Sequence, residues 1–422
     1  MARARVLVIS PQPFFEMRGT PLRVRQMLRA LSAAGYEVHL ASYHLGQPLG
    51  VEGVVHHRAA RVPGVHSVPV GFSWRKVVLD GVLALAVWRL LLRYRFDVVH
   101  CVEESIFFAL PLARARGARV IFDLNSSVAH QLEYSGAVRS PALLRLARAL
   151  QARALRRSAL AITVGRSLTE EGVLSLVEDV PVAEIEDCPV DADDGVPDPL
   201  ELASLRHAYG LEGRPVAVYT GNLASYQGLD LLYSALETVK ARCPTARVLI
   251  VGGDATEIEV ARAKLAARGL ADAVVFTGVQ PAHRMPTFMA LGQALVSPRC
   301  GGRNTPLKLY SYMASGLPIV ATDLPTHTQV LDSTCAILCE PTPEDFGERL
   351  AGVLAEPGAF ASLGGAARAR VRESYSPEEF SRRLLAAYAR VLAESFLSSA
   401  TTMYPRVHGT SASSAANTRM NG

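Results

Sequence analysis

The stretch from Ser297 to Pro318, SPRCGGRNTPLKLYSYMASGLP, decides the fold expected for this chain. Its first residue, Ser297, ends ALVS, a short apolar run that predicts a buried strand. Thr305 and Pro306 predict the start of a helix, because Thr is a good N-cap and Pro is favoured at the first helical position. Gly316 ends that helix, and Ile319–Thr322 is the next apolar run. Alternation of strands and helices predicts a parallel sheet covered on both faces.

The same stretch offers a place for a phosphate. The free N–H groups of a first helical turn and the helix dipole attract anions, and Lys308 adds a full positive charge. The alternative is an ordinary capped helix with a solvated lysine. Gly221–Gly228, GNLASYQG, also ends a predicted strand. Its glycines permit close approach of a ligand to the backbone, although tight turns need glycine as well.

Outward from this stretch the pattern repeats. In the second half the expected strands are Val216–Thr220, Arg247–Val251, Val274–Thr277, Ala294–Ser297 and Ile319–Thr322. In the first half they are Val6–Ile9, Val38–Ser42, Phe96–Cys101, Arg119–Asp123 and Ala159–Val164. The fold class is therefore α/β, with two doubly wound Rossmann-like domains. Because ligands bind at the carboxyl ends of such strands, we expect the two domains to face each other across one cleft.

The domain boundaries follow from composition. We expect a first domain over 1–190, a linker rich in Pro and Asp over 191–213, and a second domain over 214–376. A helix over 377–397 is expected to return to the first domain. Residues 398–422 are rich in Ser and Thr without an apolar period, which predicts a disordered tail.

Charge is distributed unevenly along the 422 residues. Residues 1–169 carry 23 Lys and Arg against 9 Asp and Glu, whereas residues 170–422 carry 21 against 30. A basic half suits an anionic partner. The six cysteines form no CxxC pair, which favours a reducing cytoplasm and argues against a metal site.

Two basic segments of the first half also have apolar faces. Val77–Leu92 is interrupted by Asp80 and Arg89, so we interpret it as a buried or interfacial helix rather than a membrane span. Residues 134–169 hold seven Arg and no acidic residue. Basic charge beside apolar faces predicts docking to an anionic membrane surface, with a solvated helix face as the alternative. No nucleic-acid-binding module is recognised.

Several stretches together resemble the retaining glycosyltransferases of family 4, which have the GT-B fold. In the second half these are YTGNLASYQGLDLL, VLIVGGD, VVFTGV and PLKLYSYMASGLPIVATD. In the first half they are RVLVISPQPFFEMRGTPLRVRQMLRALSAAGYEVHLAS and FDVVH. The resemblance spans roughly residues 4–390, and a subset of the family has a similar NTPLKxYSY pattern.

The resemblance implies transfer of a sugar from a nucleotide-sugar, UDP- or GDP-linked, with retention of configuration and no bound metal or other cofactor. The donor would bind mainly to the second domain and the acceptor, a lipid-linked molecule or surface glycan, to the first. We expect a cytoplasmic enzyme, docked on the inner face of the cytoplasmic membrane. The alternatives are a nucleotide-sugar epimerase of the same fold and a non-catalytic sugar-nucleotide-binding subunit.

Site residues carry over position by position. Lys308 and Asn304 are expected to stabilise the leaving group. The resemblance places the donor against a set of glycine and polar residues: Gly19, Gly221, Asn222, Gln227, Gly252, Gly253, Arg303, Thr305 and Ser311. Candidates on the acceptor side stand at strand ends of the first domain: His100, Glu103, Glu104, Asp123 and Asn125. A core histidine and a solvated turn are the alternatives for His100 and for the two glutamates.

The chain departs from the family at four of these positions. Family members often carry two glutamates where this chain has Arg303 and Ser311. Arg303 cannot accept a hydrogen bond, and Ser311 offers one hydroxyl in place of a carboxylate. Gln227 and Asn222 stand where the family often has Lys and Arg. We therefore expect Lys308 to supply the charge that neutralises the donor phosphates.

Overall fold

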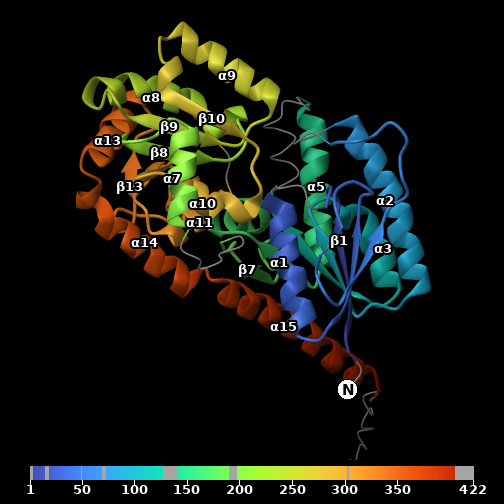
Figure 1. Ribbon diagram of the computed structural model, residues 1–422. Helices are drawn as coiled ribbons and strands as arrows, with labels where there is room; N and C mark the ends of the chain where they lie inside the picture. The colour runs from blue at the N-terminus through green and yellow to red at the C-terminus, as the bar shows by residue number, and fades with distance from the viewer. Residues whose placement is uncertain are drawn as a thin grey trace, which may run out of the picture.

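In the computed structural model the strands form two parallel sheets, one in each half of the chain (Figure 1). The structure describes residues 3–14, 19–48, 50–68, 73–126, 140–189, 197–301 and 304–403, except for the side chains of 394–403. The sheet orders are β3-β2-β1-β4-β5-β6-β7 and β10-β9-β8-β11-β12-β13. In each sheet the order reverses beside the first strand of that half. The predicted α/β fold with two doubly wound sheets is confirmed.

The strands are short and largely buried, as their continuous apolar runs predict. The first sheet consists of β1 (Arg5–Ser10), β2 (Glu37–Ser42), β3 (Val54–Arg58), β4 (Val98–Val102), β5 (Arg119–Leu124), β6 (Leu160–Thr163) and β7 (Val182–Glu184). The second consists of β8 (Val216–Thr220), β9 (Arg247–Val251), β10 (Val274–Gly278), β11 (Ala294–Ser297), β12 (Ile319–Thr322) and β13 (Ile337–Cys339). Every ladder between these strands is parallel, so their carboxyl ends lie at one edge of each sheet.

Helices cover both faces of each sheet. On the first sheet, one apolar core lies under α2 (Trp74–Arg93), α3 (Ser105–Ala115) and α5 (Pro141–Arg157), and the other under α1 (Gly19–Ala33) and α15 (Pro377–Met403). On the second sheet, one core lies under α8 (Leu229–Arg242), α9 (Ala255–Ala267) and α13 (Pro343–Ala355). The other lies under α7 (Pro199–Ala208), α10 (Met285–Met289), α11 (Lys308–Ser315) and α14 (Ala361–Ser374).

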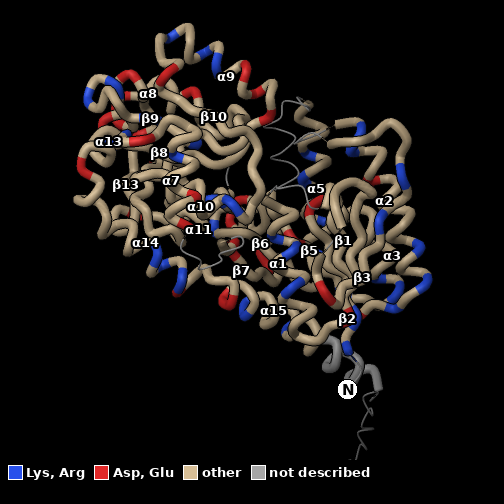
Figure 2. The backbone as a smooth tube through the Cα atoms, in the orientation of Figure 1, with Lys and Arg blue, Asp and Glu red and all other residues tan. Residues whose placement is uncertain are grey.

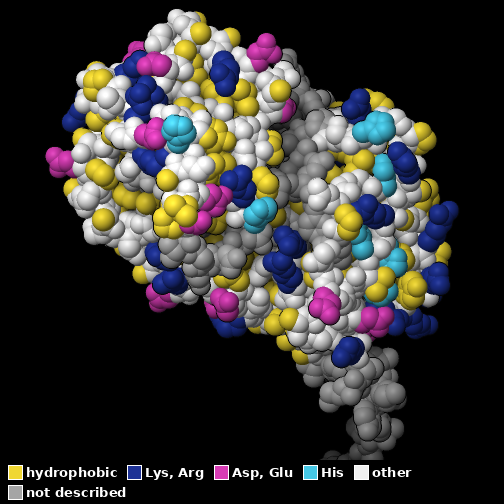
Figure 3. Space-filling view, in the orientation of Figure 1, with side chains coloured by type: hydrophobic (Ala, Val, Ile, Leu, Met, Phe, Trp, Pro, Cys, Tyr) yellow, Lys and Arg dark blue, Asp and Glu magenta, His cyan; other side chains and the backbone are white. Residues whose placement is uncertain are grey.

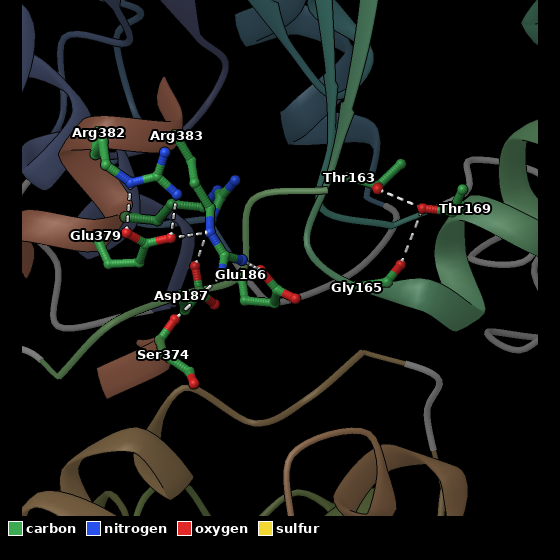
Figure 4. Close-up of polar contacts among 10 residues, drawn as sticks. Thr163, Gly165, Thr169, Glu186, Asp187, Ser374, Glu379, Arg382 and Arg383 are labelled. Atoms are coloured by element: carbon green, nitrogen blue, oxygen red, sulfur yellow. Dashed lines mark hydrogen bonds and ion pairs between the residues drawn. The ribbon is translucent and has the colours of Figure 1, made fainter. Parts of the chain in front are cut away.

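The C-terminal helix α15 packs on the first sheet, far from it in sequence. Phe380 and Tyr388 are buried among side chains of β1, β4 and α1. Arg383 forms ion pairs with Glu379 of its own helix and with Glu186, just after β7, as Figure 4 shows. The last helix of the described chain therefore completes the core of the first half.

Some elements lay outside the sequence predictions. Strands β3, β7 and β13 and helix α14 were not predicted, and α7 lies within the expected linker. Helix α15 extends to Met403, and the remainder of the expected tail, 404–422, lies outside the described residues. By length and composition, no single helix of the described chain could cross a membrane. Helix α13 and the segment Pro357–Ala393 pass that test only together, as a pair bent by 107°.

Candidate functional site

Glycines crowd the carboxyl edge of the second sheet. The Gly252 N–H donates to the Gly278 carbonyl over 2.9 Å, and the Gly221 N–H donates to the carbonyl of Val251 over 3.0 Å. A Cβ on Gly252 would lie 2.1 Å from the Gly221 oxygen, and both residues have φ near 130°. These turns therefore need glycine in order to pack against each other, and this need does not depend on a bound ligand. Gly253 is similar, because its Cβ would lie 2.5 Å from the side chain of Leu223.

Lys308 lies beside these glycines, at the first residue of α11. Its Nζ is 3.8 Å from the centroid of the Tyr219 ring and 3.3 Å from Gln227 Oε1. The amide of Gln227 in turn donates to Asn222 Oδ1 over 3.4 Å. The structure thus brings together three residues that were predicted for the donor side from separate parts of the sequence.

The charge of Lys308 is poorly compensated. Among the described residues no carboxylate contributes to the pKa shift of Lys308, whereas the nearby charge of Arg299 repels its ammonium group. Burial, together with that repulsion, lowers the pKa of Lys308 well below its usual range. The charged form of a half-buried lysine in this environment gains free energy when an anion binds beside it.

The helix start differs from the prediction. Thr305 was expected to cap the helix, and this is wrong: α11 begins at Lys308 with no side-chain cap. The N–H groups of Leu309 and Tyr310 donate to the carbonyls of Pro306 and Leu307, so a tight turn precedes the helix. The charge of Lys308 therefore stands at the helix N-terminus itself. Thr305 is buried.

The other predicted donor-side residues are spread around this edge. The Asn304 side chain is exposed, and its Oδ1 accepts from Arg299 Nη2 over 3.1 Å. Ser311 is half-buried on the second turn of α11, and Gly19 begins α1 in the other half. Arg303 lies outside the described residues. Sequence reasoning missed Arg299, although a basic residue just after a buried strand was a usable signal.

Acidic residues mark the carboxyl edge of the first sheet. Glu103 follows β4, and its carboxylate accepts from Gln12 Nε2 over 3.0 Å and from Ser126 Oγ over 3.2 Å. Glu104 instead forms an ion pair with Lys76 of α2. Burial and the neighbouring Glu104 charge raise the pKa of Glu103 to about 7, against the opposing charge of Lys76. Asn125 follows β5 and is buried, and neither atom of its amide has a hydrogen-bond partner.

His100 and Asp123 belong to a buried network instead of an open edge. His100 contacts the Tyr388 hydroxyl over 2.8 Å and Asp123 Oδ2 over 3.2 Å, and all three side chains are buried. Arg23 lies 3.9 Å from Asp123 and 2.7 Å from Asp187. Burial acts to raise the pKa of Asp123, but the Arg23 charge and the His100 contact outweigh it and hold that pKa below its usual range. Both nitrogens of His100 are thereby engaged inside the protein, and a contact with an acceptor stays a prediction.

A furrow separates the two halves in Figure 3. A cavity of about 240 Å³ lies between them. It is lined from the first half by Gly165 and Glu186, among others, and from the second by Thr305 and Gln329. Gln329 Oε1 also accepts from the Ser167 N–H over 3.0 Å, which joins the halves. Among the described residues no group of three or more His, Cys, Asp and Glu side chains could hold a metal ion.

Two family models match the chain. The model described as "Glycosyltransferase Family 4" matches residues 17–174, and the one described as "Glycosyl transferases group 1" matches residues 214–356. Together they cover most of both sheets and the carboxyl edges at which the residues above gather.

Curated relatives match over parts of the chain. A GDP-mannose-dependent alpha-(1-6)-phosphatidylinositol monomannoside mannosyltransferase of Mycolicibacterium smegmatis is 33% identical over 199 residues, which are 44% of this chain and 52% of the relative. An alpha-D-kanosaminyltransferase of Streptomyces kanamyceticus is 29% identical over 153 residues, 35% of this chain and 39% of that protein. The chain thus spans about half the length, or less, of the curated relatives it matches.

Solved structures match over nearly the whole chain. A sucrose-phosphate synthase from Thermosynechococcus elongatus has a TM-score of 0.73 at 18% identity, over 93% of this chain and 100% of that one. HepE from Anabaena, in complex with UDP and glucose, has a TM-score of 0.71 at 12% identity, over 92% and 100%. At such identities the likeness concerns the fold.

Proposed function

Because the chain belongs to the group 1 glycosyltransferases of family 4, we propose that it transfers a sugar from a nucleotide-sugar to an acceptor hydroxyl. The proposal extends to retention of configuration and to catalysis without a metal ion. Sugar transfer is supported by the two family models, which match both halves, and by relatives whose names describe sugar transfer.

The observation that carries the proposal is Lys308. It combines an amine whose charged form an anionic ligand would stabilise, the N-terminus of α11 and the lack of a carboxylate partner among the described residues. Leaving of a nucleoside diphosphate places negative charge on the phosphate oxygens, and fixed donors aimed at that charge lower the barrier. Lys308 and the first turn of α11 would stabilise the leaving group. Gln227 and Asn222 would hold the Lys308 side chain from the other side, through the contacts described above.

The proposed donor is a GDP- or UDP-linked sugar. The Mycolicibacterium relative is named as GDP-mannose-dependent, and the similar fold of HepE was solved with UDP and glucose. The proposed acceptor is a lipid-linked molecule or surface glycan, since the same relative is named for a phosphatidylinositol monomannoside.

A surface of the first half supports a lipid-linked acceptor. Helix α2 exposes Trp74, Val77, Leu85, Trp88 and Leu92, each by more than 40%. Basic residues stand among them and along the neighbouring helices α3 and α5, as Figure 2 shows. The exposed basic residues of α2 are Arg75, Arg89 and Arg93. We propose that this face docks on an anionic membrane, because apolar burial and lipid charge then act together.

The proposed location is the cytoplasm, at the inner membrane surface. All six cysteines are free thiols, which suits a reducing compartment. Docking through α2 would hold the enzyme at the surface where a lipid-linked acceptor is found.

Thermal shifts with GDP, UDP, ADP and CDP test the donor site. A nucleotide at 100 times its dissociation constant stabilises the folded protein by roughly 2.7 kcal/mol. We expect one nucleotide to stabilise the wild type, and Lys308→Ala to lose most of that shift. Lys264→Ala is the matched control, since Lys264 is paired with Asp230 on the outer helices. A full shift in Lys308→Ala would refute the assignment of Lys308.

Product analysis then separates the functions. Incubation with GDP-mannose and phosphatidylinositol monomannoside should give a glycosylated lipid and free GDP. An altered sugar nucleotide without transfer would identify an epimerase, and binding without turnover or hydrolysis would identify a non-catalytic subunit.

A further inference from the structure

Glu103 has an unusual backbone for its position. Its φ is 51°, and among the described residues it is the one non-glycine residue with positive φ. The Glu103 N–H donates to the Asp123 carbonyl over 2.9 Å, which holds this conformation between β4 and β5. Such conformations persist where the surrounding structure imposes them, and they gather at functional sites. The effect here is to direct the carboxylate toward the loops that follow β1 and β5.

The partners of that carboxylate are neutral. Gln12 follows β1 and Ser126 follows β5, so the Glu103 carboxylate joins the ends of three neighbouring strands. The adjacent Glu104 is paired with Lys76 and faces α2. The two successive glutamates thus differ: Glu104 forms a direct ion pair with Lys76, whereas the direct partners of Glu103 are neutral and Lys76 acts on it only from a greater distance.

Unused hydrogen-bonding groups lie at the same strand ends. Asn125, one residue before Ser126, is 6% exposed, and neither its amide nitrogen nor its oxygen has a hydrogen-bond partner. The hydroxyl of Ser10, the last residue of β1, is also buried and without a partner. Buried polar groups without partners are costly, so their presence at a strand end points to a polar ligand.

We propose that these strand ends form the subsite for the attacking hydroxyl, in which Asn125 and Ser10 bind the acceptor and Glu103 takes the proton of that hydroxyl. This rests on the proposed function. The acceptor O–H bond breaks and its proton passes to a Glu103 carboxylate oxygen. The acceptor oxygen forms a bond to the anomeric carbon of the donor sugar. The bond from that carbon to the diphosphate breaks, and the electron pair leaves with the nucleoside diphosphate.

The electrostatics of the edge suit this step. Burial and the Glu104 charge raise the pKa of Glu103 to about 7, while Lys76 and the hydrogen bonds from Gln12 and Ser126 act in the opposite direction. Asp80 of α2 also belongs to this group of charges, because its charge acts on Lys76 and raises the pKa of that lysine. A carboxyl group that titrates near neutral pH can both accept and release a proton during turnover.

The test compares Glu103→Gln with the wild type, using GDP-mannose and UDP-glucose as donors and phosphatidylinositol monomannoside in detergent micelles as acceptor. The wild-type kcat should rise as pH increases through about 7. Glu103→Gln should lose that dependence and turn over on the order of 10²- to 10⁴-fold more slowly. Asn125→Ala should raise KM for the acceptor more than it lowers kcat. The control is Glu37→Gln, at the opposite edge of the same sheet, where Glu37 pairs with Arg5.

A nucleotide-induced thermal shift equal to that of the wild type would show that Glu103→Gln is folded and binds donor, since Lys308, Gln227 and Asn222 lie in the other half. Wild-type kcat and pH dependence in this variant would overturn the assignment of Glu103 and leave the proposed function standing. An unchanged acceptor KM in Asn125→Ala would overturn the binding part. A wild type that releases no nucleotide from either donor would overturn the proposed function, and this subsite with it.

Discussion

Replacing Arg23 by Met tests how the buried charges of the first half contribute to its stability. The Arg23 side chain is 3% exposed, and it lies between Asp123, which is fully buried, and Asp187, which is 15% exposed. Met conserves much of the apolar contact with Phe380, over which the guanidinium lies. Removal of the cation leaves two buried carboxylates without it. Breaking a buried pair in this way costs about 3–5 kcal/mol.

The loss should depend on pH, with a sign that the structure fixes. In the wild type the pKa of Asp123 is lowered, so its contribution is present above the unfolded pKa and is lost as pH falls through the folded value. In Arg23→Met the folded pKa values of both carboxyls should rise above their unfolded values. Their protonation then favours the folded state at low pH, and this is lost as pH rises. The deficit of the variant should therefore be smaller at pH 5 than at pH 8, by about 1.4 kcal/mol for each unit of raised pKa that this window spans.

Urea unfolding followed by tryptophan fluorescence measures this directly. The two tryptophans, Trp74 and Trp88, both lie on α2, so the signal reports on the first half. The control is Arg29→Met on the exposed face of the same helix, which should cost no more than about 1 kcal/mol. A deficit below 1 kcal/mol in Arg23→Met, or one that grows as pH falls, would refute this account of the cluster.

Two further outcomes concern the second sheet and the membrane. Gly252→Ala should cost several kcal/mol and abolish nucleotide-induced stabilisation, because its Cβ would meet a backbone oxygen 2.1 Å away; Gly269→Ala, with open space at its Cβ, should cost only about 1 kcal/mol. An equal loss in both glycine variants would contradict the packing argument. Reversing the charge of the three exposed arginines of α2 should weaken sedimentation with phosphatidylglycerol vesicles by 100-fold or more, since each basic residue near such a surface contributes about 1 kcal/mol. The variants are Arg75→Glu, Arg89→Glu and Arg93→Glu combined, against reversal of three basic residues at α9 as control: Arg262, Lys264 and Arg268. Equal binding by both triple variants would refute the proposal that the α2 surface docks on an anionic membrane.

The strands that were predicted from the sequence are those with continuous apolar runs. A central parallel strand has such a run because both of its faces are buried. The missed strands lack that signal. β3, VVHHR, lies at a sheet edge with half-exposed histidines, and β7 and β13 are three residues long and also lie at edges. The helix cap failed for a different reason. Thr and Pro satisfied the local rule, but a tight turn at Pro306 and Leu307 shifted the helix start to Lys308, which composition does not reveal.

The sequence predicted which residues lie at the carboxyl ends of the strands, and to that extent it located the candidate site. Residues that follow central strands were named correctly as lying at the carboxyl edges. Their partners depend on contacts between distant segments. Lys308 reaches Gln227 across 81 positions, and His100 reaches Tyr388 across 288. No local pattern distinguishes a histidine that faces a cleft from one that contacts helix α15.

The contrast between Glu103 and Asp123 shows why a strand-end position does not define a function. Both carboxylates are buried at the same sheet edge, on neighbouring strands. Asp123 faces the α1 and α15 layer, where Arg23 and His100 hold its charge and its pKa falls. Glu103 adopts positive φ, faces neutral donors, and its pKa rises to about 7. A carboxylate stabilised by a buried cation holds the fold together and releases its proton only in acid. One whose direct partners are neutral can exchange a proton near neutral pH, and this is the property that the proposed role of Glu103 requires.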